Sequence, residues 1–374
     1  MKRLRRAALA LCLPGALAAQ GTLGGQGFGY PAGQLGARAA ATGGALGPFD
    51  ALSPINPASI TGFPRAMLFV HLEPEYRSTR VDGAEASTSE SRMPLAGGAA
   101  RIGKHGTLAV TVSTYLDRTW QTSSAGTEQI GNDTVNLTTS FQSSGAINDV
   151  RLAYAWAFDD SVKIGVGFHA YTGENRLTIN WVFPDSGQFG DVSQKGALTY
   201  TGTAFSLGGE FKIARHVGVS AYGRIGGGAR MSTGDTVVSK ANMPDHVGFA
   251  VKYDGLTGTV IAAAWEHIGW SALRSLGSAD IGVRDAQRIS IGAESRGPSL
   301  GGTPVYLRAG VAHRTLPFSA LGSQVSETLV TAGLGYTLAR GAANVDFAVQ
   351  HAARSAGAGR ETAWLWTLGF AITP

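Results

Sequence analysis

Apolar and polar residues alternate along most of the chain from about residue 66 onward. Near the C-terminus, Trp364, Trp366, Leu368, Phe370 and Ile372 share one face, and small or polar residues share the other. The same two-residue period recurs at 150–158, 162–168, 305–311, 330–338 and 345–349. Side chains of a β-strand point alternately to opposite faces of its sheet. The pattern therefore predicts an all-β chain.

The alternating segments predict about fourteen strands. They lie near 66–80, 94–103, 107–121, 147–159, 161–173, 198–212, 217–231, 244–254, 257–268, 285–296, 303–315, 325–340, 342–353 and 362–373. Short connections alternate with longer, mostly polar ones. This is typical of a transmembrane antiparallel β-barrel, whose sheet must close because lipid offers its backbone no hydrogen-bond partner.

A large secreted β-sandwich would show the same alternation, because it also buries one face of each strand. A sandwich accounts neither for the alternating turn lengths nor for the basic residues among the small side chains of the second face. The barrel also predicts aromatic residues at the two membrane interfaces. The candidates for these girdles are Tyr154, Trp156, Trp265, Trp270, Trp364 and Trp366.

The first eighteen residues have the features of a secretory signal peptide. Lys2, Arg3, Arg5 and Arg6 precede a short apolar run at 7–17. We therefore expect residues 1–18 to be removed and the mature chain to lie in the outer membrane of a Gram-negative-type bacterium. Four of the 31 basic residues leave with this segment, so 27 remain against 26 acidic residues, and nothing suggests nucleic-acid binding. The single cysteine, Cys12, leaves as well.

The segment between the signal peptide and the first strand is rich in glycine and alanine. The predicted division is a signal peptide at 1–18, a hatch that plugs the lumen at 19–64, and a barrel at 65–374. Pro57 biases Asn56 away from helical geometry, and the asparagine amide can satisfy open backbone groups. Glycine permits the positive φ angles of a tightly packed plug. The predicted hatch residues are Asn56, Pro57, Ala58, Asp50, Gly43 and Gly44; the alternative for this stretch is a simple linker turn.

The same stretch carries a family resemblance. The run "LGARAAATGGA" at 35–45, then Asp50, then "NPASIT" at 56–61, resembles the hatch of the FadL family of fatty acid and hydrocarbon channels. The resemblance implies a fourteen-stranded barrel with passive uptake of a hydrophobic small molecule, gated by the hatch, with exit sideways into the membrane. The expected partners are outer-membrane lipids and such a ligand.

The opening also resembles the PorV family, outer-membrane components of type IX secretion, through its "GARA", "GGA" and "NPA" elements. That resemblance implies a shuttle that holds exported proteins at the cell surface, with secretion components as partners. A purely structural outer-membrane barrel is a third possibility.

Basic residues on the lumen-like faces are the candidates for binding a substrate carboxylate. They are Arg151, Lys163, Arg224, Lys252, Arg288 and Arg308. Their alternative role is pairing with Glu210, Glu266, Glu294 and Asp346 across the lumen. The eight histidines have no metal-ligand spacing, and no catalytic constellation follows from spacing alone, so we predict no enzyme, no catalytic residue, no metal and no cofactor.

Overall fold

The computed structural model describes residues 23, 25, 27–63, 65–81, 84–183, 190–276 and 282–373. The predicted signal peptide lies outside the described residues. The strands are β1 (Met67–Val81), β2 (Ala84–Ile102), β3 (Gly106–Asp117), β4 (Trp120–Ile130), β5 (Asp133–Ala157), β6 (Val162–Val182), β7 (Val192–Ala214), β8 (Val217–Thr233), β9 (Thr236–Asn242), β10 (His246–Leu256), β11 (Thr259–Ile268), β12 (Ala286–Leu300), β13 (Thr303–Ala320), β14 (Ser323–Leu338), β15 (Ala343–Ala356) and β16 (Gly359–Ile372).

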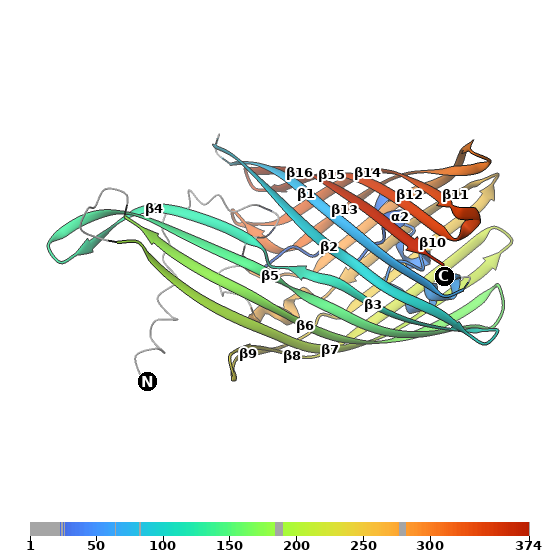
Figure 1. Ribbon diagram of the computed structural model, residues 1–374, viewed down its shortest axis with the longest axis horizontal. Coiled ribbons are helices and arrows are strands. Elements are labelled where there is room, and N and C mark those ends of the chain that lie inside the picture. Colours follow the sequence, from blue (N-terminus) through green and yellow to red (C-terminus); the bar gives the residue numbers. More distant parts are fainter. Residues whose placement is uncertain are drawn as a thin grey trace.

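The strands form one closed antiparallel sheet (Figure 1). β4 pairs with β5 and β9 with β8, both as side hairpins, while the ladder runs directly from β3 to β5 and from β8 to β10. The other fourteen strands close into a barrel where β1 pairs with β16. The prediction of a fourteen-stranded transmembrane barrel is confirmed.

The two faces of the wall differ as the alternation predicted. Large apolar side chains such as Phe205, Ile289 and Val330 are exposed on the outside, whereas the inward residues are small, polar or charged and mostly buried. Five of the six predicted girdle aromatics are exposed on the outer face. The sixth, Trp270, is only 1% exposed, because the 3-10 helix η3 (Trp270–Leu276) places it against lumen residues. The girdle prediction was wrong for Trp270.

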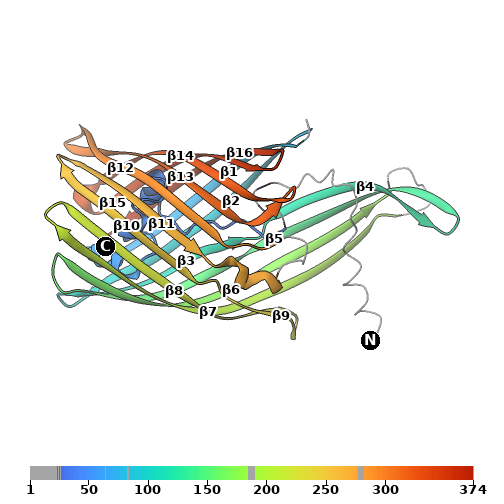
Figure 2. The same ribbon diagram turned by 180° about the vertical axis from the view of Figure 1, so that it is seen from behind.

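Several segments predicted as long loops continue the strands. β5, β6 and β7 contain 25, 21 and 23 residues and, with β4, form the long extension in Figures 1 and 2. Their outer halves are mostly half-buried or exposed and rich in Ser and Thr, as in "TTSFQSS" at 138–144. Beyond the membrane neither face needs to be apolar, so the hydropathy alternation fades while the backbone ladder continues.

The segment before β1 lies inside the barrel (Figures 1 and 2). It contains α2 (Ala37–Ala41) and two 3-10 helices, η1 (Gly47–Phe49) and η2 (Pro57–Gly62). α2 packs against β13–β16, and η2 packs against β3 and β5–β7, so the segment touches opposite parts of the wall. The predicted hatch is confirmed as part of the fold. Among the described residues, no helix is long and apolar enough to cross a membrane.

Candidate transport site in the lumen

Asn56 joins the hatch to the wall. Its side chain is fully buried and donates to Ser220 Oγ at 2.9 Å and to the Pro48 carbonyl at 3.0 Å. Its Oδ1 accepts the Ala58 N–H at 2.9 Å, which caps η2. A Cβ placed on wall residue Gly208 would lie 2.0 Å from that same oxygen, so the wall is glycine where the asparagine approaches it. These contacts support the anchoring role predicted for Asn56.

Glycines of the hatch and the wall permit a second close approach. Gly43 and Gly44 have φ angles of +64° and +90°, a region that disfavours other residues. The Gly43 carbonyl accepts a hydrogen bond from Arg288 at 2.5 Å. Across from them, a Cβ on Gly292 or Gly310 would lie 2.2 Å from backbone atoms of Thr42. The hatch backbone therefore lies directly against the strands.

The buried Asp50 organises the middle of the hatch. Its carboxylate accepts a hydrogen bond from Ser53 Oγ at 2.7 Å, and a weaker one from the Leu52 N–H at 3.4 Å. Burial raises the pKa of Asp50 above its ordinary value, although the nearby Arg38 and the Ser53 hydrogen bond oppose that rise. Arg38 itself forms two hydrogen bonds with Glu294 on β12, at 2.7 and 2.8 Å. Sequence reasoning missed Arg38, because its partner is 256 residues away.

Most of the predicted lumen cations face acidic partners. Arg308 contacts both Glu294 (2.6 Å) and Asp346, Arg288 lies 3.7 Å from Glu266, and Lys163 lies 3.5 Å from Glu210. The remaining cations of that prediction differ. Lys252 lies over the Phe49 ring and Arg224 lies over the rings of Tyr115 and Tyr171, 3.6 Å from Asp149.

Arg151 stands apart from these pairs. It is 1% exposed, and all three guanidinium nitrogens lack a hydrogen-bond partner. Leaving a buried cation without a partner is costly, so such a side chain marks a place where an acceptor fits.

A buried network around Tyr30 was missed at the sequence level. The guanidinium carbons of Arg92, Arg314 and Arg354 lie 4.7–5.0 Å from the Tyr30 ring centroid, and Arg77 lies at 5.7 Å. These arginines pair with buried acidic residues on the surrounding strands. The acids are Glu73, Glu75, Asp117, Glu327 and Glu361. Glu73, Glu75 and Arg77 lie at every second residue of β1, but only barrel closure brings the charges of the other strands to them.

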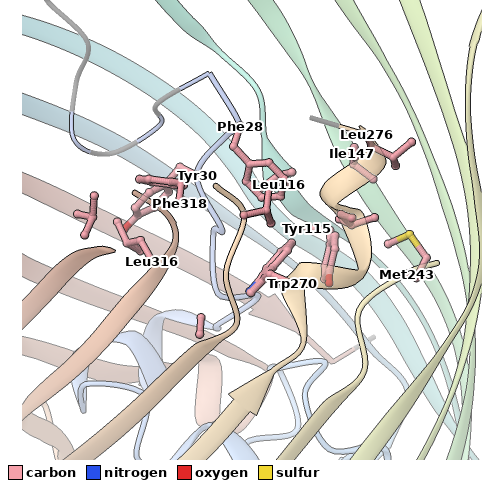
Figure 3. Packing of buried hydrophobic residues seen from close by; sticks show 14 of the residues in the cluster. Phe28, Tyr30, Tyr115, Leu116, Ile147, Met243, Trp270, Leu276, Leu316 and Phe318 are labelled. Atoms are coloured by element: carbon pink, nitrogen blue, oxygen red, sulfur yellow. The ribbon is translucent and has the colours of Figure 1, made fainter. Parts of the chain in front are cut away.

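Apolar side chains fill the lumen on the outer side of the hatch (Figure 3). Trp270 lies at the centre, stacked on Tyr115 (5.0 Å between ring centroids) and edge-on to Phe28 (6.0 Å). We call this group the lumen cluster. Its largest other members are Tyr30, Leu116, Ile147, Tyr171, Tyr200, Met243, Leu273, Leu316 and Phe318. An apolar cluster inside the lumen is the opposite of the polar interior typical of water-filled porins.

A small cavity lies between the lumen cluster and the hatch residues Gln34 and Ile55. Its volume is about 40 Å³, enough for one or two water molecules. Trp270, Tyr115 and Ile268 line one part, and Gln34 and Arg224 line another. Apolar and cationic groups therefore meet immediately above the hatch.

The ladder between β2 and β3 stops part-way up the wall. It ends at the Leu95–Ser113 pair, and the rest of β2 pairs only with β1 (Figure 1). At the end of β3, Asp117 exchanges both backbone hydrogen bonds with Tyr30 of the hatch, at 2.7 and 2.9 Å. The hatch therefore supplies backbone partners that β2 does not.

A second interruption lies between β1 and β16. The pairing skips Glu73 and Pro74, where proline has no N–H to donate. Outside it is a groove of about 700 Å³, lined by Leu72, Pro74, Tyr76, Phe347, Trp364, Trp366 and Leu368. Behind the wall at this point lies the charged Tyr30 network, so no apolar route leads inward.

Most of the chain superimposes on solved structures. It superimposes on a Pseudomonas aeruginosa FadL homologue with a TM-score of 0.64 and 12% identity, covering 92% of this chain and 99% of that one. A P. putida toluene transporter, TodX, gives a TM-score of 0.61 at 14% identity, with 91% and 99% covered. The monoaromatic hydrocarbon channel CymD gives 0.57 at 12% identity, with 91% and 97% covered.

The fold is that of the FadL-type channels. The structural resemblance inferred from the hatch motif is thereby confirmed. The sequence matches no protein-family model and no curated protein. The second resemblance, to the PorV family, stays a prediction. Within the described ranges, no group of three or more His, Cys, Asp or Glu residues could hold a metal ion.

Proposed function

We propose that this FadL-type barrel lies in the outer membrane and lets hydrophobic small molecules enter by passive diffusion, with the hatch as its gate. The observation that carries the proposal is the lumen cluster, because an apolar lumen attracts apolar solutes and repels ions and sugars. The names of the neighbours, a toluene transporter and a hydrocarbon channel among them, support the same substrate class.

The proposed route starts at the outer end, passes Phe28 and Trp270, and reaches the cavity above the hatch. The exit we favour is the β2–β3 interruption, since Tyr115 and Leu116 of the lumen cluster lie on β3 beside it. Tyr30 bridges the hatch to β3 at that point. A shift of the hatch would release this bridge, and thereby couple gating to the exit.

The cationic residues suggest that the route also accepts acids. Arg224 lines the cavity, and Arg151 is a buried cation whose guanidinium nitrogens have no hydrogen-bond partner. Replacing Arg151 with Gln should therefore slow uptake of a long-chain fatty acid and leave uptake of toluene nearly unchanged. Lys195→Gln, an exposed change on the outer half of β7, is the matched control.

Uptake by proteoliposomes tests the channel directly. Wild-type protein should speed entry of oleate or toluene without making the vesicles permeable to a small sugar. Trp270→Ala should change the rate several-fold, while Trp364→Ala, on the outer face, should not. Rapid sugar entry with no gain for the apolar compounds would contradict the channel.

Native mass spectrometry of protein purified from its own membrane separates the alternatives. A bound fatty acid or hydrocarbon, lost when Asn56 and Pro57 are replaced, would support the gated channel. A stoichiometric exported protein together with an empty lumen would favour the secretion shuttle. If neither a ligand nor a protein is bound, the structural barrel is the alternative that remains.

A further inference from the structure

Three side chains on neighbouring strands form a Ser-His-Asp chain of hydrogen bonds inside the lumen. His169 Nδ1 on β6 lies 2.9 Å from both carboxylate oxygens of Asp149 on β5. His169 Nε2 lies 2.9 Å from Ser206 Oγ on β7. All three are buried, with exposures of 1%, 0% and 7% for His169, Asp149 and Ser206. Transport by diffusion makes no use of this arrangement.

The direction of the two hydrogen bonds follows from the chemistry of the partners. An ionised carboxylate only accepts hydrogen bonds, so His169 Nδ1 carries a proton and donates it to Asp149 in a hydrogen bond. In the neutral ring Nε2 is then an acceptor, and the Ser206 hydroxyl donates to it. Asp149 is held in place by Gln34 Nε2 at 2.9 Å. This is the orientation in which an imidazole can take the proton of a serine nucleophile.

The wall residue beside Ser206 is Gly167, where no larger side chain would fit, and a cation lies next to it. A Cβ placed on Gly167 would lie 2.5 Å from Ser206 Oγ, 3.5 Å from His169 Nε2 and 3.6 Å from Arg151 Cδ. The three side chains thus converge on one point of the wall. Arg151 lies directly across the β5–β6 ladder from His169, and its nitrogens have no partner. Donors without a partner beside a nucleophile can stabilise an oxyanion.

We propose that Ser206, His169 and Asp149 form a hydrolytic site for carboxylic esters of apolar acids or alcohols, a second activity besides transport. Ser206 Oγ attacks the ester carbonyl carbon and gives its proton to His169 Nε2, while the carbonyl oxygen becomes an oxyanion beside Arg151. The bond to the alcohol oxygen breaks, and that oxygen takes the proton from Nε2. A water molecule, deprotonated by His169, then attacks the acyl carbon. The bond to Ser206 Oγ breaks, that oxygen takes the proton back from Nε2, and the acid leaves.

Fluorophosphonate labelling of the full-length protein in detergent tests the site without knowledge of the natural ester. A small dialkyl probe and a long-chain probe should both modify Ser206, identified by peptide mass spectrometry. Ser290 is a buried lumen serine on β12 that is not part of the Ser206–His169–Asp149 group, and it should stay unmodified. The wild-type protein should also hydrolyse p-nitrophenyl butyrate, and Ser206→Ala should abolish that activity.

Variants distinguish a reactive serine from a merely structural network. His169→Gln should slow labelling about 10²-fold or more, the usual contribution of a general base. His313→Gln, on the outer face of β13, should have no effect. Arg151→Gln should slow ester hydrolysis about 10²-fold through loss of oxyanion stabilisation.

Folding of each variant is checked by circular dichroism and by heat-dependent migration on gels. Failure of both probes to label Ser206 in folded wild-type protein overturns the proposal. Labelling that persists unchanged in folded His169→Gln overturns it too. Because neither readout depends on uptake, the result is independent of the transport function.

Discussion

Asn56 of the hatch and Ser220 of β8 are joined by a hydrogen bond of 2.9 Å, although 164 residues separate them in the chain. The same asparagine also caps η2 and contacts Pro48, so one side chain connects two hatch segments to the wall. Anchoring of this kind makes the hatch part of the cooperative barrel rather than a free tail.

Asn56→Ala should loosen the hatch. The change leaves the buried Ala58 N–H without its partner, which costs about 1–3 kcal/mol for an unsatisfied buried group. We expect a lower thermal midpoint and more frequent openings in single-channel recordings. Asn242→Ala, an exposed change at the end of β9, is the control, and an equal effect there would contradict the anchoring role.

Gly165→Ala should displace the hatch from the wall. The added Cβ would lie 2.4 Å from the Pro57 carbonyl carbon, and such overpacking typically costs about 1–3 kcal/mol. Protease sensitivity of the hatch in folded barrels would report the displacement. Gly196→Ala meets nothing within 4 Å and should behave like wild type, so similar sensitivity in both variants would rule out this packing argument.

Arg354→Met should be strongly destabilising. Arg354 is buried among Glu75, Glu327 and Glu361, at 2.9, 2.6 and 2.5 Å. Removing one partner from a buried ionic network leaves uncompensated charge, at a cost of about 3–5 kcal/mol. The thermal midpoint of the heat-modifiable band measures the loss. Arg176→Gln disrupts an exposed pair with Glu174 and should shift the midpoint much less; comparable shifts would refute the network's importance.

Asp50 should make stability depend on pH. Burial raises its pKa in the folded chain above the unfolded value, so the folded state binds a proton more readily. Stability should therefore rise as the pH falls through the folded pKa, and the gain should be fully present, with no further dependence on pH, below the unfolded pKa of about 4. Asp50→Asn should remove this slope.

Thermal midpoints of both proteins between pH 4 and 8 measure the effect. The advantage of the Asn variant should be largest at neutral pH. Asp133→Asn, exposed at the start of β5, serves as the control. An advantage for Asp50→Asn that grows as the pH falls would have the wrong sign for a raised pKa.

Strand ends and loop lengths show where local patterning stops. The alternation located fourteen wall strands, but it missed the outer parts of β5–β7. Polar residues occur on both faces of these parts, so apolar and polar positions do not alternate there. Trp270 looked like an interfacial aromatic because it follows β11. Only the fold of η3 into the lumen shows that it packs on Tyr115 instead.

The candidate site was predicted in part, for a related reason. Asn56, Gly43 and Gly44 could be proposed from the chain because they lie in a recognisable hatch motif, although their partners on the wall could not. Arg38, Tyr30 and the Ser206–His169 pair could not, since their partners lie on strands distant in sequence.

The sequence by itself determined the strand period and the barrel class, because apolar and polar alternation follows directly from which face meets lipid. Its glycine-rich segment and motif before the first strand indicated the hatch. Tertiary structure alone decided which charges pair, which cation stays without a partner, and which serine meets a histidine. Those relationships arise when the sheet closes and brings together side chains whose separation along the chain carries no signal.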